Sequence, residues 1–134
     1  MTKIKLTNTK KYAIVDDFNF SVLSTLNWYS NGHYVLNSSS RKYKNRNPVS
    51  MHRLLLWAPN GYEVDHINGN GLDNRMENLR ICTREQNMAN ARPYKNATSK
   101  YKGVSYHPWS PRIKRWVARI VVNGKKNHLG YFHT

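Results

Sequence analysis

The stretch YEVDHINGNGLDNRMENLRICTREQN, residues 62–87, holds five of the seven carboxylates of the chain. The run NGYEVDHI predicts an Asn-Gly turn followed by a strand, and LRIC predicts a second short strand. Thr83, with Gln86 three residues later, fits a capping box and predicts a helix over TREQNMANA. The stretch therefore predicts two short strands joined by a polar, glycine-containing loop and followed by a helix.

The charge outside this stretch is strongly basic. The 134 residues, enough for one ordinary domain or two very small ones, carry a net charge of +15. From Gln86 to Thr134 there are ten Lys or Arg and no carboxylate. Such a surface favours a polyanion, with nucleic acid as the default partner.

Other classes of protein fit the sequence less well. No run approaches the roughly 20 apolar residues that span a membrane, and MTKIKLTNTKK has no apolar run for a signal peptide. We expect a cytoplasmic protein, in the host cell if a phage encodes it, without a membrane partner. Cys82 is the only cysteine, which excludes an internal disulfide and a CxxC zinc site, and its apolar neighbours predict burial.

Three segments can be separated along the chain. Residues 1–50 carry strand signals in KIKL, KYAIVD and GHYVLNSSSR and a short helix signal in FNFSVLSTLNWY, and residues 37–48 predict a basic loop. Residues 51–91 add MHRLLLWAP, a short buried helix or strand, to the stretch quoted above. Residues 92–100 form a basic linker. Residues 101–134 predict three strands, YKGVSYHP, RWVARIVV and NHLGYF, the last two joined by an Asn-Gly turn.

Asp65 and His66 are the first candidate site residues. Adjacent residues of a strand point to opposite sides, so one can bind a metal and the other a water only if the strand ends and twists there, as Gly69 and Gly71 would permit. Cleavage of a phosphodiester needs an activated water, neutralised charge and a stabilised leaving oxygen. A neutral imidazole can accept the proton of the water, and a hard divalent cation with oxygen ligands can supply the rest.

Two asparagines extend this candidate site. Asn87 falls in the second turn of the predicted helix and could complete a metal site with Asp65. Asn78 is placed to tie the loop or to fix the ring of His66 by a hydrogen bond. Asp73 and Glu77 fit loop caps or partners of nearby arginines better than metal ligands.

The motif D-H-x(11)-N-x(8)-N, flanked by MHRL, VDHINGN, LDNR, NLR and TREQN, resembles the HNH nucleases of the ββα-metal type, and among them the small homing endonucleases of phages. The resemblance covers residues 51–90. It implies that Asp65 and Asn87 bind one divalent metal ion (Mg²⁺ or Mn²⁺), that His66 is the general base and that Asn78 is structural. It also implies products with a 5′ phosphate and a 3′ hydroxyl. His52 and Arg53 could contact a phosphate near the scissile bond or be structural.

The C-terminal segment resembles the three-stranded sheet of the APETALA/ethylene-response-type DNA-binding domain. The marks are Y-K-G-V, a Pro-Trp pair, W-x-A-x-I and H-L-G-x-F. In that family the sheet lies in the major groove. The positions that carry over are Lys102, Ser105, His107, Trp109, Arg119, Lys126 and His128. Several of them are not Arg where the family often has Arg, so sequence specificity does not transfer.

This segment departs from the family in one respect. The family continues with a helix that covers the back of the sheet, whereas the sequence stops at Thr134 without one, and we expect a truncated gene. Trp116, Ala118, Ile120 and Val122 then need another cover: the nuclease segment, a second chain such as a homodimer partner, or nothing.

The sequence thus predicts an α+β fold with a ββα-metal HNH nuclease core, a small N-terminal β-rich segment and a C-terminal three-stranded antiparallel sheet. The function it favours is a divalent-metal-dependent endonuclease acting on double-stranded DNA, and one site per chain favours nicking. The alternatives are a non-catalytic DNA-binding protein on a relic HNH scaffold, and an RNA-directed nuclease or RNA-binding protein.

Overall fold

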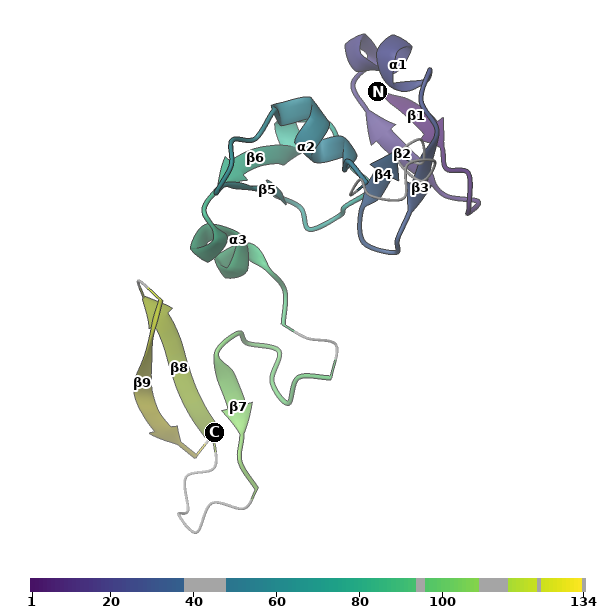
Figure 1. Cartoon of the computed structure of the whole chain (residues 1–134). Coiled ribbons are helices and arrows are strands. Elements are labelled where there is room, and N and C mark those ends of the chain that lie inside the picture. Colours follow the sequence, from purple (N-terminus) through teal and green to yellow (C-terminus); the bar gives the residue numbers. More distant parts are fainter. Residues whose placement is uncertain (38–47, 94–95, 109–115, 123, 134) are drawn as a thin grey trace. The chain divides into compact units, whose positions relative to one another are not determined.

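The structure, a computed structural model, describes every residue except 38–47, 94–95, 109–115, 123 and 134. The chain forms two compact units, residues 1–90 and residues 91–134. The fold is mixed, with small antiparallel sheets and short helices (Figure 1). No helix in the described part is long and apolar enough to cross a membrane. The basic loop expected at 37–48 lies almost entirely outside the described residues.

Two hairpins and a helix open the first unit. The antiparallel pairs are β1 with β2 and β3 with β4. The elements are β1 (Thr2–Lys5), β2 (Tyr12–Val15), α1 (Asp17–Leu23), β3 (Trp28–Ser30) and β4 (Val35–Asn37). These confirm the strand signals, whereas the predicted helix ends at Leu23 and its last residues enter β3. Trp28 explains the break, because its indole is buried and its Nε1 donates to the carbonyl of Leu23 at 2.7 Å.

A hairpin and two helices complete the first unit. The elements are α2 (Met51–Leu56), β5 (Glu63–His66), the 3₁₀ turn η2 (Met76–Asn78), β6 (Leu79–Cys82) and α3 (Arg84–Asn90). Antiparallel β5 and β6 contact α2, and β5 also contacts α3 (Figure 1). The capping box is confirmed: the amide of Thr83 donates to Gln86 Oε1 at 2.9 Å, and the amide of Gln86 donates to Thr83 Oγ1 at 3.3 Å. Cys82 is buried, as expected.

One apolar core joins residues on both sides of position 50. Its buried members are Ile4, Leu6, Ala13, Val15, Leu23, Trp28, Val35 and Met51, and the partly buried Leu26, Leu54, Leu55 and Leu72 pack against them. The members in α2 and in the β5–β6 loop therefore pack on the N-terminal hairpins. Burial of each large apolar side chain contributes about 1.5–3 kcal/mol, so the core anchors that loop to the rest of the unit.

The edge of β2 fixes the loop between β5 and β6. The amide of Ile14 donates to the carbonyl of Leu72 at 2.8 Å, and the carbonyl of Ile14 accepts from the amide of Asn74 at 2.8 Å. At Gly71 the loop also comes so close to the β3–β4 turn that an added Cβ would lie 1.8 Å from the carbonyl oxygen of His33. Only glycine fits there, so the loop and the β3–β4 turn are held together.

The second unit contains one three-stranded antiparallel sheet in the order β7 (Val104–Tyr106), β8 (Trp116–Val122) and β9 (Lys125–Phe132). Gly124 has φ +74, which suits the tight turn expected between the last two strands. Within the described part of this unit the structure has no helix. Val117 is its one buried hydrophobic residue among those described, whereas Ile120 and Val122 are about half exposed.

Candidate active site

The site is built on the β5–β6 hairpin and on α3. Asp65 and His66 are the last two residues of β5, and both are buried. Their side chains contact different neighbours: Asp65 contacts Arg80 and Asn90, whereas the ring of His66 contacts Tyr34 and His52. Alternation along a strand predicts this difference. The strand ends at His66, which is the condition under which the two residues could share one site.

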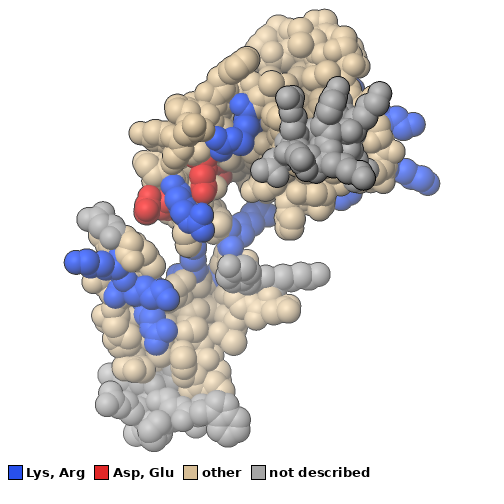
Figure 2. Space-filling model, in the orientation of Figure 1, with Lys and Arg blue, Asp and Glu red and all other residues tan. Residues whose placement is uncertain are grey.

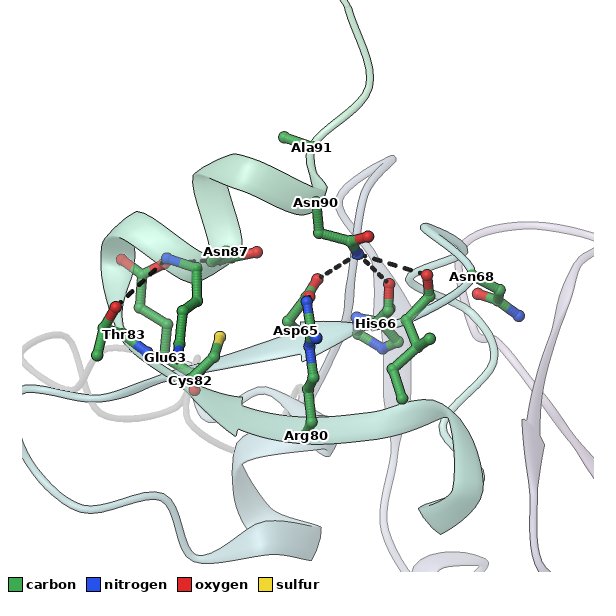
Figure 3. A network of polar contacts seen from close by, with 12 residues as sticks. Glu63, Asp65, His66, Asn68, Arg80, Cys82, Thr83, Asn87, Asn90 and Ala91 are labelled. Carbon is green, nitrogen blue, oxygen red and sulfur yellow. Dashed lines mark hydrogen bonds and ion pairs between the residues drawn. The ribbon is translucent and has the colours of Figure 1, made fainter. Parts of the chain in front are cut away.

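Asp65 is held by three nitrogen donors from two residues. The guanidinium of Arg80 donates to Oδ2 through Nη2 at 2.7 Å and Nε at 3.0 Å. The amide of Asn90 donates to Oδ1 at 3.1 Å. Figure 3 shows Arg80 reaching Asp65 from β6 and Asn90 reaching it from the end of α3. The carboxylate is therefore fixed in direction while only 6% exposed.

The imidazole of His66 lies in a cluster of rings. Tyr34 stacks on it with the ring centroids 5.8 Å apart, and His52 meets it nearly perpendicularly at 5.0 Å. Its Nε2 lies 3.5 Å from Oδ1 of Asn74. With the proton on Nε2, this contact leaves the lone pair on Nδ1.

The environment of His66 keeps its ring neutral. Burial lowers the pKa of His66, and the hydrogen bond of Asn74 and the charges of Asp65 and Asp73 only partly oppose this effect. An imidazole whose pKa lies below its ordinary value is unprotonated at neutral pH. His66 can therefore accept a proton under those conditions.

Asn78 ties the loop. Its Nδ2 donates to the carbonyl of Asp73 at 2.7 Å, and its Oδ1 accepts from the amide of Asn68 at 2.9 Å. Of the two roles that the sequence allowed, these contacts correspond to tying the loop, whereas the amide beside the ring of His66 belongs to Asn74.

The acidic residues of the loop pair with an arginine, as expected. Asp73 accepts from Nε and Nη2 of Arg75, each at 2.8 Å, and Glu77 pairs with Nη1 of Arg75. The hydrogen bond from Arg75 lowers the pKa of Asp73. Arg80, which could have been a further partner of these acids, pairs with Asp65 instead.

Asn87 lies one turn before Asn90 on α3. Its Nδ2 donates to Oε2 of Glu63 at 2.6 Å. Glu63 and Asp65 are two residues apart on β5 and share a face, so the two asparagines of α3 meet the two acids of β5 (Figure 3). The structure thus places Asn90, and not Asn87, against Asp65. The sequence offered a signal for Asn90, because residues three apart lie on the same side of a helix.

These residues offer oxygen donors suited to a hard divalent cation. The candidate donors are the carboxylates of Asp65 and Glu63 and the amide oxygen of Asn87, a set that suits Mg²⁺ or Mn²⁺. Among the described residues no group of three or more His, Cys, Asp or Glu side chains could hold a metal ion. A site made here would therefore combine few carboxylates with amides and waters.

His52 and Arg53 are both turned into the first unit. The guanidinium of Arg53 donates to the carbonyls of Tyr62 at 3.0 Å and Ala58 at 3.5 Å, which holds the chain after α2. His52 is 6% exposed and its Nε2 lies 3.2 Å from Ser50 Oγ, whereas its Nδ1 has no partner in the described part of the chain. Burial, followed by the charges of His66 and Arg53, lowers the pKa of His52 to about 4.

Acidification is therefore expected to destabilise the protein. Below the ordinary value of 6.5 the unfolded chain protonates His52 and the folded chain does not, so stability is full above pH 6.5 and is lost as the pH falls to about 4. The loss reaches about 3 kcal/mol. Thermal unfolding across this range measures it, and His52→Phe, which cannot titrate at this position, should reduce the dependence to the part that His66 contributes. Equal pH dependence in both proteins would contradict the assignment.

The candidate DNA-contacting residues of the second unit are mostly exposed. Arg119 pairs with His128 and Val121 with Lys126 across β8 and β9, so Arg119, His128 and Lys126 share one face of the sheet. Ser105 Oγ lies 3.2 Å from His107 Nε2, and Lys102 Nζ donates to the carbonyl of Ala91 at 3.1 Å. Trp109 lies outside the described residues.

Charge on the surface follows the sequence. In the face drawn in Figure 2, acidic side chains occupy one area of the first unit, next to basic side chains, and the second unit shows Lys and Arg alone. The acidic area belongs to the unit that carries Asp65, and the second unit offers only positive charge to a polyanion.

Comparison with known proteins identifies the part of the chain that carries this site. Residues 58–89 match the family model of the HNH endonucleases. A curated relative, Protein 3.8 of Escherichia phage T7, is 36% identical over 71 residues, which are 53% of this chain and 56% of the phage protein. The chain thus spans about half the length of this relative. No solved structure matches the chain.

Proposed function

We propose that the chain is a divalent-metal-dependent enzyme that hydrolyses phosphodiester bonds of double-stranded DNA. The match of residues 58–89 to the HNH endonucleases supports this, because it indicates a DNA endonuclease. The observation that carries the proposal is the pair at the end of β5: His66, whose ring lies among those of Tyr34 and His52, follows Asp65, whose carboxylate is fixed by α3 and β6. A general base can activate the water that attacks the phosphodiester, and a neighbouring carboxylate can bind the metal ion that neutralises the phosphate.

In this proposal each residue has one task. His66 accepts the proton of the attacking water on Nδ1, while Asn74 orients the ring through Nε2. Asp65 and Asn87 hold the metal, as the resemblance implies, and Asn90 keeps Asp65 pointed toward α3. When bound, the metal ion neutralises charge on the phosphate oxygens and stabilises the leaving oxygen. Asn78 holds the loop that carries Asn74. The order β5, β6, α3 agrees with a ββα-metal core.

An experiment can distinguish the roles of the two asparagines of α3, Asn87 and Asn90. Asn87→Ala is expected to weaken the apparent affinity for Mg²⁺ in DNA cleavage by about 10- to 100-fold, and Asn90→Ala by less, because the second acts on a ligand and not on the metal. Rates measured over a Mg²⁺ titration give both values. If Asn90→Ala has the larger effect on metal affinity, the ligand is Asn90 and the assignment of Asn87 is wrong.

The second unit supports the choice of substrate. It has no carboxylate and presents Arg119, Lys126 and His128 on one face of its sheet. We assign it attraction to the DNA backbone, which requires only positive charge. Charge alone also suits a protein that binds DNA without cutting it, and this is the second candidate function.

The test uses supercoiled plasmid DNA and single-stranded RNA of comparable length. With Mg²⁺ or Mn²⁺ the protein is expected to convert the plasmid to nicked circles, because each chain has one site, and to leave the RNA intact. Ligation of the nicks by DNA ligase reports a 5′ phosphate and a 3′ hydroxyl. Binding of the plasmid without cleavage under either metal would favour the non-catalytic alternative, and cleavage of RNA alone would overturn the choice of substrate.

A further inference from the structure

Both oxygens of the Asp65 carboxylate accept hydrogen bonds from nitrogen donors. Oδ2 receives both hydrogen bonds from Arg80, and Oδ1 receives the amide of Asn90 (Figure 3). Within the described residues, Arg80 is the residue that forms an ion pair with Asp65. One of the two oxygens that a cation could take is thus held by a guanidinium.

The position of Arg80 follows from the pairing of the hairpin. Asp65 and Arg80 are directly opposed across β5 and β6, so their side chains lie on the same face and their Cβ atoms lie about 5 Å apart. A buried carboxylate without a counter-charge is costly, and the guanidinium supplies that charge. The hairpin therefore brings its own cation to the candidate metal ligand.

The two partners differ in exposure. The side chain of Asp65 is 7% exposed, whereas that of Arg80 is 45% exposed. Its long stem can carry the guanidinium into solvent while β6 stays paired. Asp65 has no such freedom, because it is buried and Asn90 holds its other oxygen.

We infer that Arg80 is a positioning residue that holds the place of the metal ion on Asp65 and sets the affinity of the site for metal. This inference rests on the proposed function. A divalent cation and a guanidinium repel each other and compete for the same carboxylate, so metal binding weakens the ion pair of Arg80 with Asp65. In the absence of metal, Arg80 keeps the buried carboxylate neutralised and correctly directed.

Metal binding without DNA tests the inference. Mn²⁺ binding to the full chain is measured by electron paramagnetic resonance for the wild type, for Arg80→Met and for Arg80→Gln, which both remove the charge. Each variant is expected to bind Mn²⁺ about tenfold more tightly than the wild type, as expected for the loss of a competing ion pair with one buried partner. Arg84→Met is the matched control. The side chain of Arg84 is 77% exposed, and its Nη1 lies 3.8 Å from Oε1 of Glu63, so this substitution removes the same charge nearby without changing a contact of Asp65.

Thermal unfolding supplies a second readout. In chelator, Arg80→Met is expected to melt below the wild type, because Asp65 loses its counter-charge, and saturating Mn²⁺ should close this gap. A purely structural arginine would leave the gap open and the Mn²⁺ affinity unchanged or weaker, which would overturn the inference. An equal gain in affinity in Arg84→Met would overturn it as well.

The design separates this inference from the proposed function. If the wild type binds Mn²⁺ but neither Arg80 variant binds it more tightly, the inference fails and the nuclease proposal stands. If no variant binds Mn²⁺ with or without DNA, the proposed metal site fails, and the inference fails with it. If Arg80→Met does not fold, Arg80→Gln decides, because it retains a hydrogen-bond donor to Oδ2 without the charge.

Discussion

Replacing His66 with alanine is expected to lower the rate of DNA cleavage by about 10²- to 10⁴-fold, the contribution that a positioned general base makes. His66 is the buried imidazole at the end of β5, and burial lowers its pKa. His52 is not expected to substitute, because it is buried, contacts the ring of His66 edge-on and has its Nε2 against Ser50. Single-turnover cleavage at saturating Mg²⁺ measures the loss.

The control must separate catalysis from folding. His33→Ala removes an exposed histidine whose ring centroid lies 6.5 Å from that of Tyr34, and it should cleave at the wild-type rate. His66→Ala should bind DNA with unchanged affinity, since His66 is only 4% exposed and offers little surface to DNA. Full cleavage by folded His66→Ala would show that another group takes the proton.

Replacing Asp65 with asparagine is the second change with a large expected effect. The variant keeps the shape of the side chain but loses its charge, so both the metal affinity and the ion pair with Arg80 should weaken. We expect cleavage at low Mg²⁺ to fall by about 10³-fold, since a metal ion supplies several kcal/mol of charge stabilisation. Cleavage rates over a Mg²⁺ titration give the dependence.

Asp73→Asn is the matched control for this change. Asp73 is also a buried aspartate paired with an arginine, but Arg75 and the loop hold it. Because the ion pair lowers the pKa of Asp73, its loss should reduce stability, most clearly above the ordinary pKa of 3.8, where the carboxylate is charged. The Mg²⁺ dependence of cleavage should stay at the wild-type value. A shift equal to that of Asp65→Asn would argue against Asp65 as the specific ligand.

Local patterns in the sequence predicted the elements that carry the site. The Asn-Gly turn at residues 60–61, the two short strands and the capping box of Thr83 and Gln86 are all confirmed, because each depends on residues a few positions apart. The partners of Arg75 were predicted for the same reason. The predicted helix after Asp17 was too long. The helical preference of the local sequence is outweighed by the burial of Trp28, and α1 ends at Leu23.

Contacts that depend on tertiary packing were not predictable from these patterns. Tyr34 reaches His66 from the β3–β4 turn, and its position depends on the close approach of Gly71 to His33. The contact of Arg80 with Asp65 depends on the register of β5 and β6, which the residues of the intervening loop do not reveal in the sequence. Asn74 meets the ring because its backbone is bonded to Ile14, sixty residues earlier in the chain.

The most direct test of the central claim is to add metal to a complex that has already formed. The full chain is bound to supercoiled plasmid in chelator, and excess Mg²⁺ is then added, with Asp65→Asn treated in parallel. The account predicts no nicked circles in chelator, rapid appearance of nicked circles after Mg²⁺, and little change for Asp65→Asn. Nicking in chelator at the same rate, or equal nicking by Asp65→Asn after Mg²⁺, would contradict the account.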